Sequence, residues 1–172
     1  MIKKLLSLTV FFFLPLAGSA QLPAEVKEAF EPLMNHMWQG AGEWGDGTVF
    51  KQEQEYRWGL NGEMIHVRTW GNVSQKGFEM GLRNEGIRVW DASSGTVLFW
   101  EYDVFGGITP GVVQVEGLDI YYYYDYDTGN GTMKLCDAWI HEDETTYLFR
   151  VGVYNEDNWE QVFLEVKMSR KS

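Results

Sequence analysis

The chain has 172 residues and a formal net charge of −11, with 14 lysine and arginine residues against 25 aspartate and glutamate residues. Such an acidic surface repels phosphate, which excludes general nucleic-acid binding and disfavours an anionic membrane surface. Hydrophobic residues make up 45% of the chain, which excludes disorder, and the single cysteine excludes a disulfide framework and a thiolate zinc site.

Residues 1–20 have the pattern of a cleavable export signal. Lys3 and Lys4 precede the apolar stretch 5–16, and small residues at 18–20 predict cleavage before Gln21. The alternative is an uncleaved anchor, but about a dozen apolar residues fall short of the roughly 20 that span a bilayer. No cysteine follows the stretch to carry a lipid. We therefore expect a periplasmic or secreted protein with no stable membrane anchor.

Residues 21–37 predict a short helical segment. Pro23 suits a first helical turn, and apolar residues recur at helical spacing as far as Met37. Pro32 removes a backbone donor within this segment, so the helix must kink or restart there.

From residue 38 to residue 172 the apolar period changes to two, and runs of β-branched and aromatic residues alternate with turn signals. The spacing predicts about ten or eleven strands. No helix-length segment separates these runs, so neighbouring strands must be antiparallel. We predict an all-β domain, an up-and-down β-barrel behind the short helix.

The strongest hairpin signal is Asn61-Gly62, which suits a type I′ turn. It places Glu55 opposite Arg68, and this charged pair marks the outer face of the hairpin. The alternate residues then face inward: Phe50, Gln52, Gln54, Tyr56 and Trp58. An unpaired buried amide costs about 1 to 3 kcal/mol, so two inward glutamines indicate a lumen that holds water or a ligand.

A second hairpin closes at residues 128–131. It pairs Asp125 with Lys134 outside and turns Tyr122, Asp137 and Trp139 inward, where Asp137 is a polar anchor or a buried acid with a raised pKa. A register slip of one residue would return Asp137 to solvent.

The same construction predicts the facing of two other segments. Around residues 91–96 it pairs Val89 with Leu98 and Ile87 with Trp100, followed by Tyr102, all facing inward. In the last strand the predicted inward set is Val162, Leu164, Val166 and Met168.

Short motifs resemble the calycin superfamily of barrels. Gly42-Glu43-Trp44 resembles the Gly-x-Trp opening of lipocalins, and Trp38-x-Gly40-x-Gly42 resembles the opening of nitrobindin-type barrels. With the motifs at residues 58–62, 90–91 and 103–107, the chain from residue 21 onward resembles bacterial secreted lipocalin-like proteins of uncharacterised function. The resemblance implies that small amphipathic molecules bind in the lumen. It also implies that Trp44 plugs the closed end beneath Arg170 or Arg150.

We therefore predict a binding lumen that holds a small amphipathic ligand and requires no chemical step. The predicted lining is Gln52, Gln54, Tyr56, Trp58, Trp100, Tyr102, Tyr122, Asp137 and Trp139. The segment 103–111 is rich in glycine and apolar residues, which indicates either a portal at the open end or a packed cover at the bottom.

We expect neither a metal nor a haem cofactor. Haem-binding relatives ligate iron through a histidine late in the chain, whereas the histidines here are His36, His66 and His141. No Gly-x-Ser-x-Gly motif occurs. Cys136 lies in an apolar run, which favours a buried inert thiol over a nucleophile.

Two other functions remain open. Tyrosines at residues 121–124 must reach both faces of one strand, and with Trp70 and Trp90 also assigned outward they predict an exposed aromatic strip. Such a strip is typical of a carbohydrate-binding module, and it can equally cover the N-terminal helix or join two copies, so both monomer and homodimer remain open. A calycin-fold enzyme is the other alternative.

Overall fold

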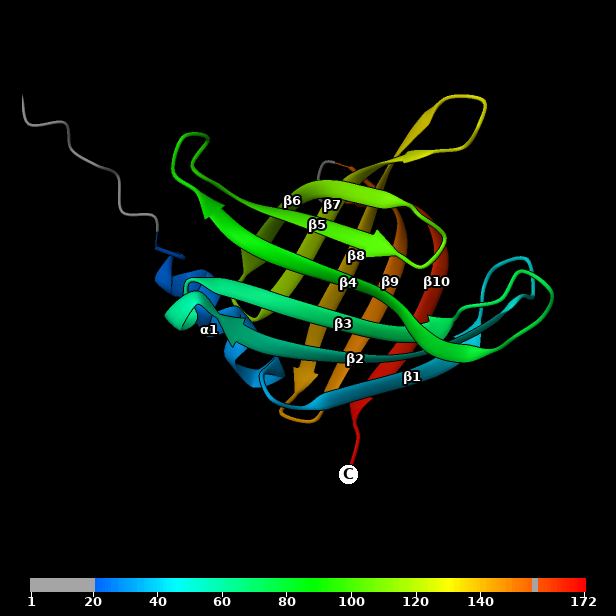
Figure 1. Ribbon diagram of the computed structural model, residues 1–172, viewed down its shortest axis with the longest axis horizontal. Helices are drawn as coiled ribbons and strands as arrows, with labels where there is room; N and C mark the ends of the chain where they lie inside the picture. Colours follow the sequence, from blue (N-terminus) through cyan, green and yellow to red (C-terminus); the bar gives the residue numbers. More distant parts are fainter. Residues whose placement is uncertain (1–20, 156–157) are drawn as a thin grey trace, which may run out of the picture.

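The computed structural model describes residues 21–155 and 158–172, so the predicted export signal at residues 1–20 lies outside the described residues. A short helix, α1 (Ala24–Phe30), and a 3-10 turn, η1 (Glu31–Leu33), precede ten strands (Figure 1). The strands are β1 (Met37–Glu43), β2 (Val49–Gly59), β3 (Met64–Asn72), β4 (Met80–Asp91), β5 (Thr96–Asp103), β6 (Ile108–Glu116), β7 (Asp119–Asp127), β8 (Thr132–Asp143), β9 (Thr146–Asn155) and β10 (Asn158–Arg170). Each strand pairs with the next and β10 pairs with β1, which closes the barrel. The predicted all-β antiparallel barrel is confirmed.

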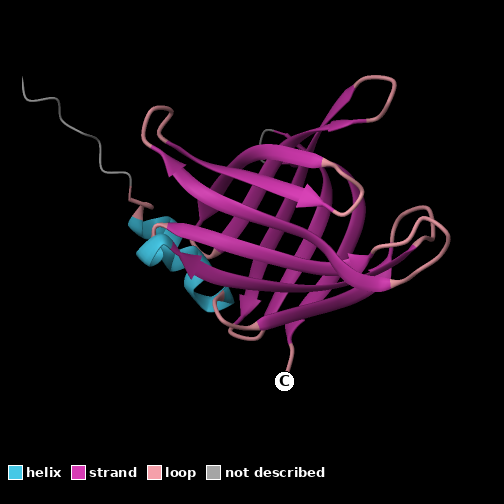
Figure 2. Ribbon diagram, viewed as in Figure 1, coloured by secondary structure: helices cyan, strands magenta, loops and turns pink. Residues whose placement is uncertain are grey.

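The N-terminal helix covers one end of the barrel (Figure 2). Val26, Ala29 and Phe30 of α1 are buried in the main core, and Pro32 stands in the first turn of η1 where the helix is interrupted. Glu63, in the turn between β2 and β3, accepts hydrogen bonds from the Leu22 backbone (2.8 Å) and from Lys27 (2.9 Å). No helix in the described part of the chain has the length and hydropathy needed to cross a membrane.

The tryptophan that closes this end is Trp38, so the implied role of Trp44 as the plug is wrong. Trp38 is fully buried, donates from Nε1 to the Leu33 carbonyl (3.2 Å), and packs edge-on against Tyr147 at 5.1 Å. β1 runs from the closed end to the open end, and six residues of strand correspond to about 20 Å. Trp44 therefore lies at the opposite mouth, where its ring contacts Phe50.

The implied basic partners do not cover a plug either. Arg170 is paired with Trp38 in the strand ladder and is exposed, while Arg150 donates to Glu165 on the outer face.

Two glycines of β1 allow β10 to pack closely across it. A Cβ on Gly40 would lie 2.4 Å from the sulfur of Met168, and one on Gly42 would lie 2.5 Å from Val166 Cγ1. Leu164, Val166 and Met168 are buried as predicted. Val162 was also predicted to face inward, but it is 43% exposed. The reason is that the pairing of β10 with β9 shifts register between Val162 and Leu164, near the open end.

The registers of both predicted hairpins are confirmed. Glu55 lies opposite Arg68, and Gln54 is buried at 6% exposure opposite Thr69. The two charges do not bond to each other, since Glu55 pairs with Arg57 (2.7 Å) and Arg68 pairs with Glu85 (2.8 Å).

In the second hairpin, Tyr122 lies opposite Asp137 and Asp125 lies opposite Lys134. The alternative with a one-residue slip is therefore wrong.

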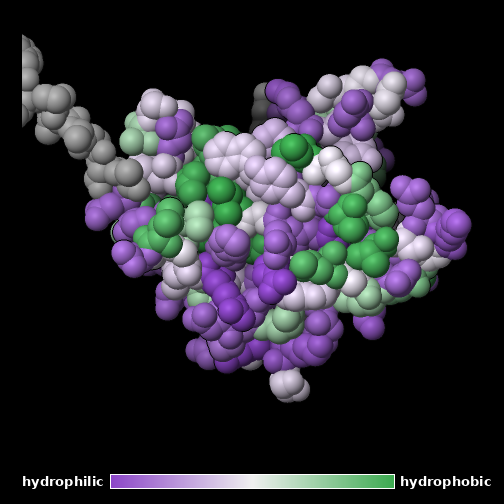
Figure 3. Space-filling model, in the orientation of Figure 1, coloured by the Kyte–Doolittle hydropathy of each residue, from purple (hydrophilic) through white to green (hydrophobic). Residues whose placement is uncertain are grey.

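The hairpin of β4 and β5 has the predicted pairs but the opposite facing. Ile87 pairs with Trp100, yet Trp100 lies on the outer face and Tyr102 is 53% exposed, so their predicted inward direction is wrong. The residues between them, among them Arg88 and Phe99, face the interior, as does Trp90. Figure 3 shows hydrophobic side chains gathered over β4 and β5 on the surface.

The reason for this inversion lies in how the polar residues are paired. In a strand with alternating side chains, the face that carries the charges is normally the outer one. Here Arg88 and Glu101 neutralise each other inside the barrel, so the alternate residues of the two strands, which include Ile87 and Trp100, lie outside.

We expect Trp38→Ala to lower the free energy of unfolding by about 3–5 kcal/mol, because it deletes a large buried ring. Trp44→Ala is the matched control and should cost far less, since Trp44 is only half-buried. Urea denaturation followed by circular dichroism measures both. Equal losses for the two variants would contradict the assignment of Trp38 to the closed end.

Candidate functional site

A cavity of about 290 Å³ lies inside the barrel. Its size is close to the lower limit of about 300 Å³ for small-molecule sites. Its polar lining includes Gln52, Gln54, Arg88, Glu101 and Asp137, and its aromatic lining includes Trp44, Phe99, Tyr122, Tyr124 and Trp139. The lumen is therefore a polar space with aromatic walls, as the inward glutamines indicated.

The structure brings most of the predicted site residues together. Those that line the cavity are Gln52, Gln54, Tyr122, Asp137 and Trp139. Tyr56 belongs to the core, and Trp58 packs against it. The ring centres of Tyr56 and of Phe30 in α1 are 6.0 Å apart. Trp100 and Tyr102 are on the outer surface and do not belong to this site. For the residues inside, a role in binding stays a prediction.

An ion pair that sequence reasoning missed lines the lumen, and in it Arg88 is buried whereas the Glu101 side chain is 22% exposed. Arg88 is 1% exposed and donates from Nη2 to Glu101, whose other oxygen accepts from Asn84 Nδ2 at 3.1 Å. The Arg88 guanidinium carbon lies 4.8 Å from the centre of the Tyr122 ring. The sequence offered no signal for this pair, because a charge between two β-branched residues, as in Ile87-Arg88-Val89, is the ordinary pattern of a strand with its charge outside.

Gly86 makes room for this pair. A Cβ at Gly86 would lie 2.7 Å from Arg88 Nη1, 2.8 Å from Glu101 Cγ and 2.5 Å from the Trp100 carbonyl oxygen. Real Cβ atoms do not approach backbone so closely, so glycine is required where the Arg88 side chain crosses the strand pair.

Several buried donors of this cluster lack partners. Nε and Nη1 of Arg88 and the hydroxyls of Tyr56 and Tyr122 have no hydrogen-bond partner within residues 21–155 and 158–172. An unpaired buried polar group costs about 1–3 kcal/mol, more when it is charged. The lumen therefore favours an occupant that supplies hydrogen-bond acceptors.

Asp137 is the acid of the lumen that titrates near neutral pH. Its Oδ1 accepts a hydrogen bond from the Tyr124 hydroxyl at 2.8 Å. Burial is the main cause that raises the pKa of Asp137, the Tyr124 hydrogen bond and Arg88 lower it, and Glu101 raises it; together these effects bring the pKa to about 7. Asp137 is thus the buried acid that the second hairpin predicted.

The two predicted amide anchors bond to each other. Gln52 donates from Nε2 to Gln54 Oε1 at 2.9 Å, so the two side chains form a short chain along the inner face of β2. This hydrogen bond satisfies one donor of the Gln52 amide and one acceptor of the Gln54 amide, and both side chains line the cavity.

The lumen opens into an apolar mouth. A second cavity of about 730 Å³ shares Trp44, Tyr124 and Tyr126 with the lumen. Its other lining includes Met133, Leu135, Val151, Val162 and Phe163. The space exists because the pairing of β8 with β9 begins only at Cys136 and Gly152, so the tip of the β7–β8 hairpin (yellow in Figure 1) diverges from β9 and β10.

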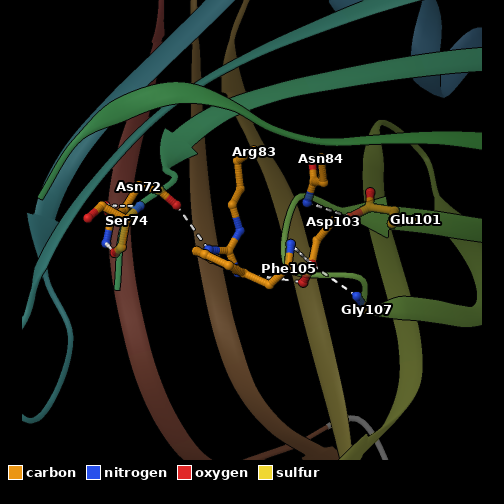
Figure 4. A network of polar contacts seen from close by, with 8 residues as sticks. All are labelled: Asn72, Ser74, Arg83, Asn84, Glu101, Asp103, Phe105 and Gly107. Atoms are coloured by element: carbon orange, nitrogen blue, oxygen red, sulfur yellow. Dashed lines mark hydrogen bonds and ion pairs between the residues drawn. The ribbon is translucent and has the colours of Figure 1, made fainter. Parts of the chain in front are cut away.

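The predicted portal loop lies at the open end and is shorter than expected, because β6 begins at Ile108. Figure 4 shows that it is held at the rim. Asp103 Oδ1 accepts from the backbone of Phe105 (2.7 Å) and Gly107 (3.0 Å), and the Arg83 guanidinium lies 4.4 Å from the Phe105 ring centre. Since α1 covers the opposite end, the alternative of a cover at the bottom is wrong.

An aromatic cluster occupies the outer face of β7–β10. Tyr121 stacks on Tyr154 at 5.6 Å, and Tyr154 contacts Trp159 at 4.9 Å between ring centres. Cys136 is buried beneath this cluster as a free thiol whose pKa is raised by burial, in agreement with the predicted inert thiol.

The three histidines stand on separate elements: His36 precedes β1, His66 is on β3 and His141 is on β8. No group of three or more metal-ligating side chains occurs in the described part of the chain.

Comparison with known proteins gives no assignment. No family model matches the chain, and no curated protein matches it in sequence. The function is therefore inferred from the lumen and its mouth.

We expect Asp137→Asn to remove a pH-dependent loss of stability. An aspartate titrates near pH 3.9 when unfolded and Asp137 near 7 when folded, so protonation favours the folded state. The native protein should lose up to about 1.4 kcal/mol per pH unit between pH 4 and pH 7 relative to the variant. Urea denaturation at each pH measures this difference.

The control is Asp91→Asn. Hydrogen bonds from Ser94 and Ser93 lower the Asp91 pKa to about 2, so the effect of this residue on stability is complete above about pH 5, where an unfolded aspartate is also ionised. The difference between Asp91→Asn and the native protein should stay constant from about pH 5 to pH 7. A constant difference for Asp137→Asn as well would contradict the raised pKa.

Proposed function

We propose that this protein binds a small amphipathic molecule, with the polar head in the lumen and the apolar part in the mouth, and that it does so in the periplasm or outside the cell. The observation that carries the proposal is a polar cavity with unpaired buried donors that opens into a larger apolar cavity. The export signal in the sequence and the motifs that resemble secreted lipocalin-like proteins support it.

The two cavities suit the two parts of such a ligand. Arg88 and Tyr122 supply donors that a polar head satisfies, and this pairing avoids the cost of burying polar groups without a hydrogen-bond partner. Trp44 lines both cavities and Leu135 and Val151 line the mouth, so an apolar chain there loses its contact with water. This division of the lining accounts for the site without a chemical step.

We expect Trp44→Ala to weaken binding of 1-anilinonaphthalene-8-sulfonate by about tenfold, because the Trp44 ring lines the lumen and the mouth. Fluorescence titration measures the affinity. Trp70→Ala is the matched control, since Trp70 is equally half-buried but lies on the outer face beside Arg68. Equal weakening by both variants would place the probe on the surface and contradict the proposal.

Carbohydrate binding is a second candidate, favoured by the outer face. A groove of about 640 Å³ there is lined by Tyr123 and Tyr154 together with polar side chains, among them Gln114, Lys134 and Asn155. Aromatic rings beside amide and charged groups are suited to stack on a sugar ring and bond its hydroxyls. Trp90 does not contribute, because it packs against the core.

For this second candidate we expect Tyr123→Ala to abolish binding of soluble oligosaccharides, whereas Gln54→Leu inside the lumen leaves it unchanged. A glycan array followed by calorimetry on the retained glycans measures the effect. An array on which the native protein retains nothing would remove this candidate.

A further inference from the structure

The unmet hydrogen-bonding capacity of the lumen is one-sided. Nε and Nη1 of Arg88 and the Tyr122 hydroxyl make no hydrogen bond of normal geometry among the described residues. The Tyr122 hydroxyl lies beside the Arg88 guanidinium and the Tyr56 hydroxyl and interacts with both. A guanidinium only donates, and a tyrosine hydroxyl donates well. Glu101 already balances the charge of Arg88, but it takes up only part of the donors. An occupant rich in acceptors and poor in donors fits this arrangement.

We infer that the ligand's head is a carboxylate that binds beside Arg88, and that its binding takes up one proton, which is held on Asp137. This inference rests on the proposed function and names the ligand class for the same site. A carboxylate has about four acceptor positions and no donor, which matches Arg88 and the Tyr122 hydroxyl, both of which line the cavity.

The proton follows from the charges that face Asp137. Arg88 on β4 is the cation, Glu101 on β5 is an anion, and Tyr122 and Tyr124 on β7 are neutral hydroxyls. Gln52, Gln54 and Thr69 face the cavity from β2 and β3, and Phe149 faces it from β9, so these strands add no charge there. Arg83 and Asp103 pair with each other at the rim.

With Glu101 and Asp137 both ionised, the inner lumen holds one cation and two anions, and a ligand carboxylate would add a third. One proton on Asp137 offsets the charge that the ligand brings, so the net charge of the inner lumen does not change on binding. The protonated acid then donates to the incoming carboxylate while Oδ1 keeps the Tyr124 bond. The overall step is a carboxylate and one proton entering together, with no covalent bond made or broken.

The pH dependence follows directly. Because the pKa of Asp137 is near 7, this residue is largely protonated at pH 6 in the free protein and binding needs no further proton. Above pH 7 the proton must come from solvent, and affinity should fall about tenfold per pH unit. A neutral head should show no such fall.

The experiment compares decanoate, decanol and decylamine, which share one chain and differ in the head. Calorimetry at pH 6, 7 and 8.5 in two buffers with different heats of ionisation gives both affinity and protons taken up. We expect decanoate to bind at least tenfold more tightly than the other two at pH 6. At pH 8.5 its binding should take up close to one proton.

Two sets of variants test Asp137 as the site of the proton and Arg88 as the site of the carboxylate. Asp137→Asn should abolish proton uptake and leave decanoate affinity constant from pH 6 to pH 8.5, whereas the exposed Asp125→Asn on β7 should behave as the native protein. Arg88→Met combined with Glu101→Gln removes both charges together and so avoids leaving a buried unpaired ion. This double variant should bind the three probes with similar affinity.

Two outcomes would overturn the inference in distinguishable ways. If the three probes bind alike without proton uptake, and Trp44→Ala weakens all of them, the head-group assignment is wrong and the proposed function stands. If none of them binds to the native protein, or if Trp44→Ala changes nothing, the proposed function fails as well.

Discussion

The ion pair of buried Arg88 with partly exposed Glu101 is the interaction on which the interior of this barrel depends. Taking an ion such as Arg88 out of water costs several kcal/mol, and this cost is offset only when the ion bonds to its partner and to further polar groups. Asn84 completes Glu101, the Tyr122 ring lies against the guanidinium, and Gly86 leaves the necessary space. Because these groups must stay inside, the alternate residues of β4 and β5, among them Ile87 and Trp100, lie on the outer face.

Polarity changes along the barrel axis, and this gradient gives the site its form. At the closed end, buried residues of α1 and Trp38 form part of the apolar core. At mid-height the ion pair and Asp137 surround a small polar cavity, and at the open end the β7–β8 hairpin diverges to leave an apolar mouth. A molecule with one polar and one apolar end matches the order of these layers, because each part meets groups of its own kind.

Features set by a few neighbouring residues could be predicted from the sequence, whereas features set by contacts between distant strands could not. The strand pairs of the β2–β3 and β7–β8 hairpins were correct because a short turn sets their register, and charged side chains then identified the outer face. The same rule gave the wrong facing for Trp100 and Tyr102, where the charged side chains are the inward ones. The position of Trp44 was taken from a three-residue motif, whereas the direction of β1 relative to α1 decides which tryptophan closes the barrel.

By itself the sequence determined the antiparallel order of strands, the helix at the N-terminus and an interior that is not uniformly apolar, since these follow from turn residues and from the alternation of side chains along one strand. Only the tertiary structure decided that Arg88, Glu101 and Asp137 share one cavity. They come from β4, β5 and β8, and closure of the barrel brings them together across its interior. Strand alternation carries no information on such contacts, because whether a buried charge is tolerated depends on the partner that another strand supplies.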